Sequence, residues 1–150
     1  MTKHLLLLAL AAVVAVAPAR AQPGPTPADA VAMVKRAVKA IKRDGAAKVY
    51  PRIDDRTGPF ADRDLYVVVT SMEGKVLATG ANSHIVGKTM LDLRDIDGKP
   101  FVRERVELAK TKPSFWQTYQ YMRPESGRIE PKRMYCERLQ ETVVCSGIYN

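Results

Sequence analysis

Aromatic and basic side chains gather in the C-terminal half of this 150-residue chain. The set comprises Trp116, Tyr119, Tyr121, Lys132, Arg133 and Tyr135. A tyrosine or tryptophan that lines a cavity offers an apolar body and one hydrogen bond, and a lysine beside it can neutralise a carboxylate. Together these residue types predict a site for a small organic acid. Because side chains alternate between the two faces of a strand, half of the set must be ordinary core or surface.

Other chemistry has little support. His84 is the only histidine beyond the first few residues, which excludes a His-pair metal site and leaves a Ser-His-Asp set possible only through it. The chain has no Gly-x-Ser-x-Gly nucleophile motif, no Walker loop and no Gly-x-Gly-x-x-Gly motif. We therefore expect no enzyme and no cofactor. His84 falls in a predicted loop, where we favour an exposed residue over a gate above the hairpin described next.

A partial calcium loop surrounds Gly98. With Gly98 at the sixth position, Asp95, Asp97 and Glu104 fall at the third, fifth and twelfth. Leu93 stands at the first position, where a carboxylate is a primary ligand, so we expect no metal site. The favoured alternative is that the two aspartates cap local turns.

The stretch 63–80 predicts a β-hairpin, because β-branched and aromatic residues run to a Glu73-Gly74 turn before a second apolar run. If Glu73 and Gly74 are the two loop residues, the cross-strand pairs are Thr70 with Leu77, Val69 with Ala78 and Val68 with Thr79. One face then carries Leu65, Val67, Val69 and Ala78, and the other carries Tyr66, Val68, Thr70, Leu77 and Thr79. The second face, with hydroxyls among its apolar groups, is a candidate wall for a ligand. Cover by helices and loops on both faces is the equal alternative.

Helix signals occur twice. Thr26 followed by Pro27 and Asp29 predicts a helix from Pro27 to Asp44, closed by Gly45. A second helix is expected over 100–111, and residues 51–62 are expected to form a loop. Strands are predicted at 115–121 and on both sides of a Gln140-Glu141 turn. Hairpin-joined strands beside a long helix predict an α+β fold with an antiparallel sheet.

Cys136 and Cys145 flank the Gln140-Glu141 turn symmetrically. Counting outward from the turn places them opposite each other at a non-hydrogen-bonded pair, where the strands approach most closely. The sequence therefore predicts a cross-strand disulfide, which acts as a clamp in an oxidising compartment. A redox role is disfavoured because the chain has no Cys-x-x-Cys spacing.

The first 21 residues resemble a secretory signal, with a charged start, an apolar run over 5–19 and an Ala19-Arg20-Ala21 exit. We expect cleavage after Ala21, which leaves residues 22–150 as one domain in the periplasm or outside the cell. The apolar run is shorter than the roughly 20 residues that span a bilayer, so a retained anchor is the disfavoured alternative. The formal net charge of +8 favours anionic small molecules or anionic lipids as partners. Nucleic acid is disfavoured for an exported chain without the usual RNA-binding motifs.

Six motifs in order carry a family resemblance. They are Asp64-Leu65-Tyr66-Val67, Gly74-Lys75-Val76-Leu77-Ala78, Val86-Gly87-Lys88, Asp95-Ile96-Asp97-Gly98-Lys99-Pro100-Phe101, Glu130-Pro131-Lys132 with Tyr135, and Ser146-Gly147-Ile148-Tyr149. On these residues the chain resembles the single-Cache domains of bacteria, second subtype. The resemblance implies a PAS-like fold: a five-stranded antiparallel sheet with a long N-terminal helix and one further helix. It also implies extracytoplasmic recognition of small molecules, commonly short organic acids, for signalling.

The same resemblance implies a ligand set. The positions that match the family's pocket side are Tyr66, Trp116, Tyr121, Lys132 and Tyr135. Two departures prevent transfer of the ligand's identity: Thr79-Gly80 stands where such domains often have His-Pro, and Lys112 to Phe115 replaces a glycine-rich segment. Family members are usually fused to a membrane helix and a receptor or kinase output, and here no output domain follows Asn150. We therefore expect a binding module that acts with a membrane partner; the alternative is a docking protein that has a filled core and binds no ligand.

Overall fold

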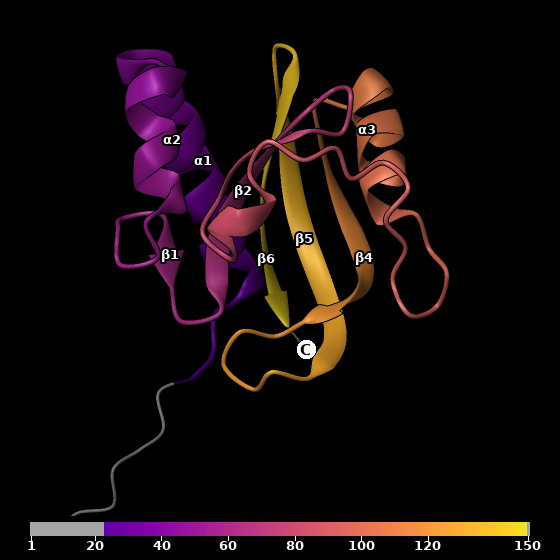
Figure 1. Cartoon of the computed structure of the whole chain (residues 1–150). Helices are drawn as coiled ribbons and strands as arrows, with labels where there is room; N and C mark the ends of the chain where they lie inside the picture. The colour runs from indigo at the N-terminus through magenta and orange to yellow at the C-terminus, as the bar shows by residue number, and fades with distance from the viewer. Residues whose placement is uncertain (1–22, 150) are drawn as a thin grey trace, which may run out of the picture.

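The computed structural model describes residues 23–149, so the predicted signal segment and its cleavage site lie outside the described residues. Helices α1 (Pro27–Asp44) and α2 (Ala46–Asp54) cover one face of an antiparallel sheet, and α3 (Phe101–Thr111) lies on the other (Figure 1). The strands follow the order β1-β2-β6-β5-β4, and β3 pairs with β2. Their bounds are β1 Ala61–Asp62, β2 Leu65–Ser71, β3 Val76–Thr79, β4 Ser114–Met122, β5 Ile129–Leu139 and β6 Thr142–Tyr149. The α+β, PAS-like prediction is confirmed; the strand beyond the expected five is the two-residue β1.

The long helix α1 has the predicted bounds because its ends are specified locally. The Thr26 hydroxyl accepts a hydrogen bond from the Asp29 backbone N–H, and the Asp29 carboxylate accepts one from the Thr26 N–H. This reciprocal pair satisfies two N–H groups that have no partner within the helix. Gly45 closes the helix at a φ of 85°, which glycine adopts without a steric cost. The buried residues of α1 then pack on β6 and β5.

The prediction of a loop over 51–62 is wrong at both ends. Helix α2 runs through Pro51 to Asp54, and β1 occupies Ala61–Asp62. Proline inside a helix normally costs a hydrogen bond. Here Val49 and Ile53, one turn apart, are fully buried against the sheet, and this burial compensates for the cost.

The β2–β3 hairpin follows the predicted register at its open end and departs from it at the turn. Val68 pairs with Thr79 and Val69 with Ala78, as expected, whereas Thr70 pairs with Val76 in place of Leu77. The Ser71 N–H donates to the Lys75 carbonyl at 2.8 Å, so the loop is longer than two residues and the ladder has a bulge. As a consequence, Leu77 packs with the cluster on the α1 side. Val76 occupies the position on the α3 side that was predicted for Leu77.

The β5–β6 hairpin has the predicted register, with Cys136 opposite Cys145 and Leu139 opposite Thr142. The two cysteines are joined by a disulfide, with their Cα atoms 4.1 Å apart. Both are fully buried in the cluster of apolar residues on the α3 side.

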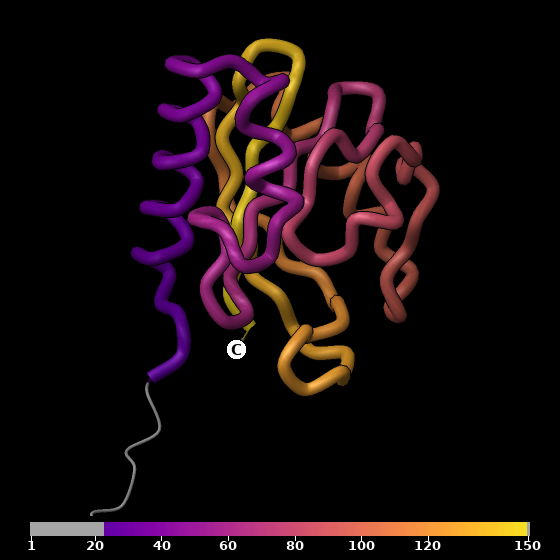
Figure 2. Tube along the Cα trace, turned by 60° about the vertical axis from the view of Figure 1, so that its left-hand side comes forward, coloured from indigo at the N-terminus to yellow at the C-terminus, as the bar shows by residue number. Residues whose placement is uncertain are grey.

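Two apolar clusters therefore lie on opposite faces of the sheet. One joins α1 and α2 to β2 and β6, and the other joins α3 to β4, β5 and the segment after β3. Figure 2 shows the long segment 80–100 on the α3 side, away from α1 and α2. Helix α3 begins one residue after its predicted start and ends at the predicted residue, Thr111. Strand β4 contains the predicted strand 115–121 and extends it by one residue at each end.

Candidate binding cleft

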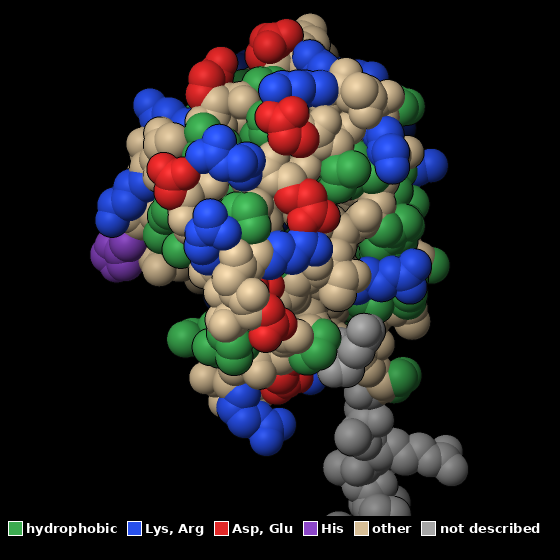
Figure 3. Space-filling model, turned by 90° about the vertical axis from the view of Figure 1, so that its right-hand side faces the viewer, with side chains coloured by type: hydrophobic (Ala, Val, Ile, Leu, Met, Phe, Trp, Pro, Cys, Tyr) green, Lys and Arg blue, Asp and Glu red, His purple; other side chains and the backbone are tan. Residues whose placement is uncertain are grey.

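A cleft of about 550 Å³ opens on the α3 side of the sheet. Its inner surface is aromatic, with Tyr66 from β2, Tyr121 from β4 and Phe101 from the start of α3. The 80–100 segment, the β4–β5 loop and the start of β5 supply the outer residues, among them Leu93, Ile96 and Ile129. Figure 3 shows the face that α3 and this segment form, where charges of both signs are mixed and hydrophobic side chains reach the surface. Between the sheet and α3 the cleft continues into a smaller cavity of about 40 Å³ that Arg105 and Tyr119 line.

Lys132 on β5 lies against this aromatic surface. Its side chain has no exposed area, and its Nζ is the one buried side-chain nitrogen or oxygen among the described residues that has no hydrogen-bond partner. Nζ lies 3.7 Å from the ring centroid of Tyr66, 4.9 Å from that of Tyr149 and 5.7 Å from that of Tyr121. Rings at these distances attract an ammonium through their negative faces. The three tyrosines thus form an aromatic cage around an amino group that forms no ion pair with any carboxylate of residues 23–149.

Gly147 makes room for this lysine. Residue 147 on β6 pairs with Met134, and a Cβ atom placed there would lie 3.1 Å from Lys132 Cε and 2.7 Å from the Arg133 carbonyl oxygen. The contact with the carbonyl oxygen is closer than van der Waals packing allows, and the contact with Lys132 is tighter than ordinary packing. Glycine at this position is therefore what lets the Lys132 side chain cross the sheet surface to the tyrosines.

Burial dominates the electrostatics of the cage. It lowers the pKa of Lys132 well below 10.5, and the nearby Arg105 guanidinium lowers it further, while Asp64 acts in the opposite direction. Burial also raises the pKa of Tyr66 well above 10. Both shifts favour the uncharged form of each group. An anion beside Lys132 would restore the stability of its ammonium, because opposite charge favours the charged form.

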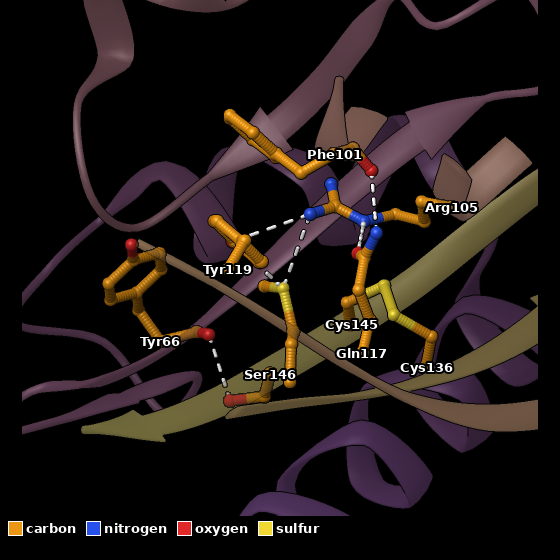
Figure 4. The surroundings of a disulfide bond; sticks show 9 residues. Tyr66, Phe101, Arg105, Gln117, Tyr119, Cys136, Cys145 and Ser146 are labelled. Atoms are coloured by element: carbon orange, nitrogen blue, oxygen red, sulfur yellow. Dashed lines mark hydrogen bonds between the residues drawn. A yellow bond between two sulfur atoms is a disulfide. The ribbon is translucent and has the colours of Figure 1, made fainter. Parts of the chain in front are cut away.

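Arg105 is a second buried cation that the sequence reasoning missed. It is 3% exposed, and its guanidinium donates to Gln117 Oε1 and to the Tyr119 hydroxyl, both at 3.3 Å (Figure 4). No carboxylate of residues 23–149 lies within ion-pair distance of it. Its spacing did carry a signal: Arg105 follows Phe101 by four residues and precedes Ala109 by four, which places it on the apolar face of α3.

Only part of the predicted ligand set lies at the cleft. Tyr66 and Tyr121 line it, and Lys132 is buried directly behind their rings. Trp116 and Tyr135 lie on the opposite face, where their ring centroids are 5.3 Å apart and both pack with the α1 cluster. Strand periodicity is the reason: 116 differs from 121, and 135 from 132, by an odd number of residues, so the members of each pair point to opposite faces. Trp116 and Tyr135 are therefore not placed to contact a ligand in this cleft.

Asp95 is structural. Its carboxylate accepts hydrogen bonds from the backbone N–H groups of Asp97, Lys99 and Gln120, at 3.0, 2.9 and 2.9 Å. This is the turn-capping role that was favoured over calcium for Asp95, and those contacts hold its pKa below the usual range. The Lys99 ammonium donates to the Thr118 carbonyl at 2.5 Å, so Asp95 and Lys99 together provide hydrogen-bond partners for backbone groups on the outer edge of β4.

Within residues 23–149 no group of three or more His, Cys, Asp or Glu side chains is arranged to hold a metal ion. His84 is exposed in the η1 turn (Ser83–Ile85), as favoured.

The β4–β5 loop that completes the cleft is attached to the start of β2. Asp64, 1% exposed, pairs with the Arg123 guanidinium and accepts a hydrogen bond from the Glu125 N–H at 3.0 Å. Arg123 also reaches Glu130 at 3.2 Å. These charge-assisted contacts position Pro124 and Ile129 beside the cleft.

Comparisons with known proteins agree with this fold. A crystal structure of a methyl-accepting chemotaxis protein from Vibrio parahaemolyticus RIMD 2210633 is 22% identical, with a TM-score of 0.69, and the match covers 81% of this chain and 86% of that one. A periplasmic sensor domain of a chemotaxis protein is 20% identical, with a TM-score of 0.63, over 79% and 86% of the two chains. A Cache chemosensory domain described in terms of carboxylic acid recognition is 18% identical, with a TM-score of 0.62, over 79% and 82%.

Two further findings concern the chain itself. No curated protein matches it. From residue 23 to residue 149, none of its helices combines the length and the apolar character that crossing a bilayer requires. The family model for single Cache domain 2 matches residues 1–149. The chain therefore belongs to the single Cache domain 2 family.

Proposed function

We propose that this protein is an extracytoplasmic sensing module that binds a small organic anion in the cleft and acts with a membrane receptor or kinase. One observation carries the proposal: the Lys132 amino group is buried among tyrosines and has neither a hydrogen-bond partner nor an anion among residues 23–149. A buried charge without a partner is costly. A carboxylate in the cleft supplies the missing partner.

The ligand's carboxylate reaches Nζ by displacing an aromatic ring. Nζ has no exposed surface, and the rings of Tyr66 and Tyr121, which lie against it, line the cleft. Rotation of one ring exchanges the ring's weak attraction for a charge-assisted hydrogen bond, which is the stronger interaction. Arg105 adds positive potential at the inner end of the cleft.

The family and the fold support the cellular role. Single Cache domains are sensory modules, and one solved relative in fold is described as a periplasmic sensor domain of a chemotaxis protein. Another is described in terms of carboxylic acid recognition. The signal-like segment predicted over residues 1–21 is consistent with export.

A thermal-shift screen of the purified protein against small carboxylates tests the proposal. Ligand at a hundredfold excess over its dissociation constant adds about 2.7 kcal/mol to the free energy of unfolding. Lys132→Met should lose the shift, whereas Arg133→Met should keep it, because Arg133 stacks on Trp116 on the opposite face, 4.5 Å from its ring. An absence of any shift, or an equal loss in both variants, would contradict the proposal. That result would favour the docking-protein alternative, which needs no ligand.

A further inference from the structure

The mouth of the cleft is apolar. Four large hydrophobic side chains are exposed among the described residues: Leu93 at 40%, Ile96 at 66%, Met122 at 57% and Ile129 at 52%. All four line the cleft, although they come from the 80–100 segment, the end of β4 and the start of β5. We call these four residues the apolar rim. A contiguous group of exposed apolar side chains marks a surface that binds another apolar group.

Three of the polar residues that line the cleft make hydrogen bonds within the protein. The Asp95 carboxylate accepts three backbone N–H groups. Arg94 donates to the Gly98 carbonyl at 2.7 Å, and Asn82 accepts from the His84 N–H at 3.0 Å. The mouth of the cleft therefore offers apolar contact to a ligand, and Lys132 lies behind the rings of Tyr66 and Tyr121, which form the inner surface.

The size of the cleft exceeds the needs of a two- or three-carbon acid. Its volume of about 550 Å³ falls within the roughly 300–1,000 Å³ typical of sites for drug-sized ligands. An acid with two or three carbons bound at Lys132 would leave the apolar rim in water.

We propose that the ligand is an amphipathic carboxylate, with its acid group at Lys132 and an alkyl or aryl tail that runs past Phe101 and Tyr121 to the apolar rim. This inference rests on the proposed function for the acid group and adds the chemical class of the remainder. The tail replaces water on the rim, and that exchange drives binding through the hydrophobic effect.

A chain-length series tests the tail. Affinities of the full protein for acetate, butyrate, hexanoate and octanoate are measured by isothermal titration calorimetry, with 1-octanol as the uncharged control. Each buried methylene should tighten binding by at most about fourfold. The double variant Ile96→Ser, Ile129→Ser alters two exposed positions and should keep the affinity for acetate while it loses most of the gain from acetate to octanoate.

Failure of the tail and failure of the site give different results. If all four acids bind equally and Lys132→Met abolishes binding, the anion site stands and the amphipathic ligand is overturned. If affinity rises with chain length but the rim variant retains the full gain, the tail does not reach the rim and the inference is overturned. If no acid binds, or if octanoate and 1-octanol bind alike with and without Lys132, the proposed function fails.

Discussion

The Nζ atom of Lys132 lies 3.7 Å from the ring centroid of Tyr66, and both side chains are buried. The ring compensates only in part for the hydration that the ammonium loses. Lys132→Met should therefore raise the free energy of unfolding of the ligand-free protein, by about 1–3 kcal/mol, the usual cost of an unsatisfied buried polar group. Urea denaturation measures the change. Arg133 lies on the opposite face of the same strand and is exposed, so Arg133→Met should change stability little. A fall in stability for Lys132→Met would show that the lysine already has a partner.

The pH dependence of stability follows from the same lysine. Its pKa is below 10.5 in the folded protein, mainly through burial, so the unfolded chain binds more protons in the window between the two values. Stability should therefore rise with pH across that window and be lowest below the folded pKa. The measurement is urea denaturation between about pH 7 and 9.5, below the range where tyrosines ionise. In Lys132→Met the rise should disappear, and an equal rise in the variant would assign it to other groups.

Two tyrosines on opposite faces of the sheet test the orientation of the site. Tyr121 lines the cleft, whereas the Tyr135 hydroxyl donates to Glu137 at 2.8 Å on the α1 side. Tyr121→Phe should weaken binding of a carboxylate ligand about tenfold, because it removes a hydrogen-bond donor to a charged group. Tyr135→Phe should leave the dissociation constant unchanged. Isothermal titration calorimetry with a carboxylate from the screen measures the dissociation constants of both variants. Weaker binding in Tyr135→Phe but not in Tyr121→Phe would place the site on the α1 face.

Asp64 should be important for the shape of the cleft. Asp64→Asn removes a buried negative charge that holds Arg123 and accepts from the Glu125 N–H. We expect a loss of about 2 kcal/mol in the free energy of unfolding and weaker ligand binding, because the β4–β5 loop loses its attachment. Asp62→Asn is the matched control, since Asp62 is 58% exposed in its pair with Arg63. Equal effects of the two variants would contradict the anchoring role.

Reduction of the Cys136–Cys145 disulfide should destabilise the protein by about 2–3 kcal/mol, as expected for a short closed loop. Unfolding in urea with and without dithiothreitol, followed by the fluorescence of Trp116, gives the value. The variant in which both cysteines are alanine should respond to urea identically with and without the reductant. If the free energy of unfolding of the wild-type protein is also the same with and without dithiothreitol, the disulfide contributes nothing to stability.

The elements that the sequence predicted best are those whose ends are determined by neighbouring residues. Thr26, Asp29 and Gly45 bracket α1 through local hydrogen bonds and a positive φ, so its bounds could be read directly. The β5–β6 register followed from a symmetric turn with Cys136 and Cys145 equidistant from it. Helix α2 was missed because the burial of residues far apart in the sequence, not local preference, decides that Pro51 lies within a helix.

The candidate site was predicted in part. Tyr66, Tyr121 and Lys132 share a face, and the period of two along each strand would have separated Trp116 and Tyr135 from them. Arg105 was recognisable from its position on the apolar face of α3. The apolar rim could not be predicted, because three segments distant in the sequence bring its members together.

Asp95 and Lys99 cover the exposed edge of β4, the last strand of the sheet, with hydrogen bonds. They bond the N–H of Gln120 and the carbonyl of Thr118, which point away from the sheet. An unsatisfied strand edge is a template on which another chain can polymerise. Because Asp95 also borders the cleft, a displacement of its turn that widens the cleft would at the same time release this edge. Resistance to aggregation and the dimensions of the cleft are therefore maintained by the same few atoms.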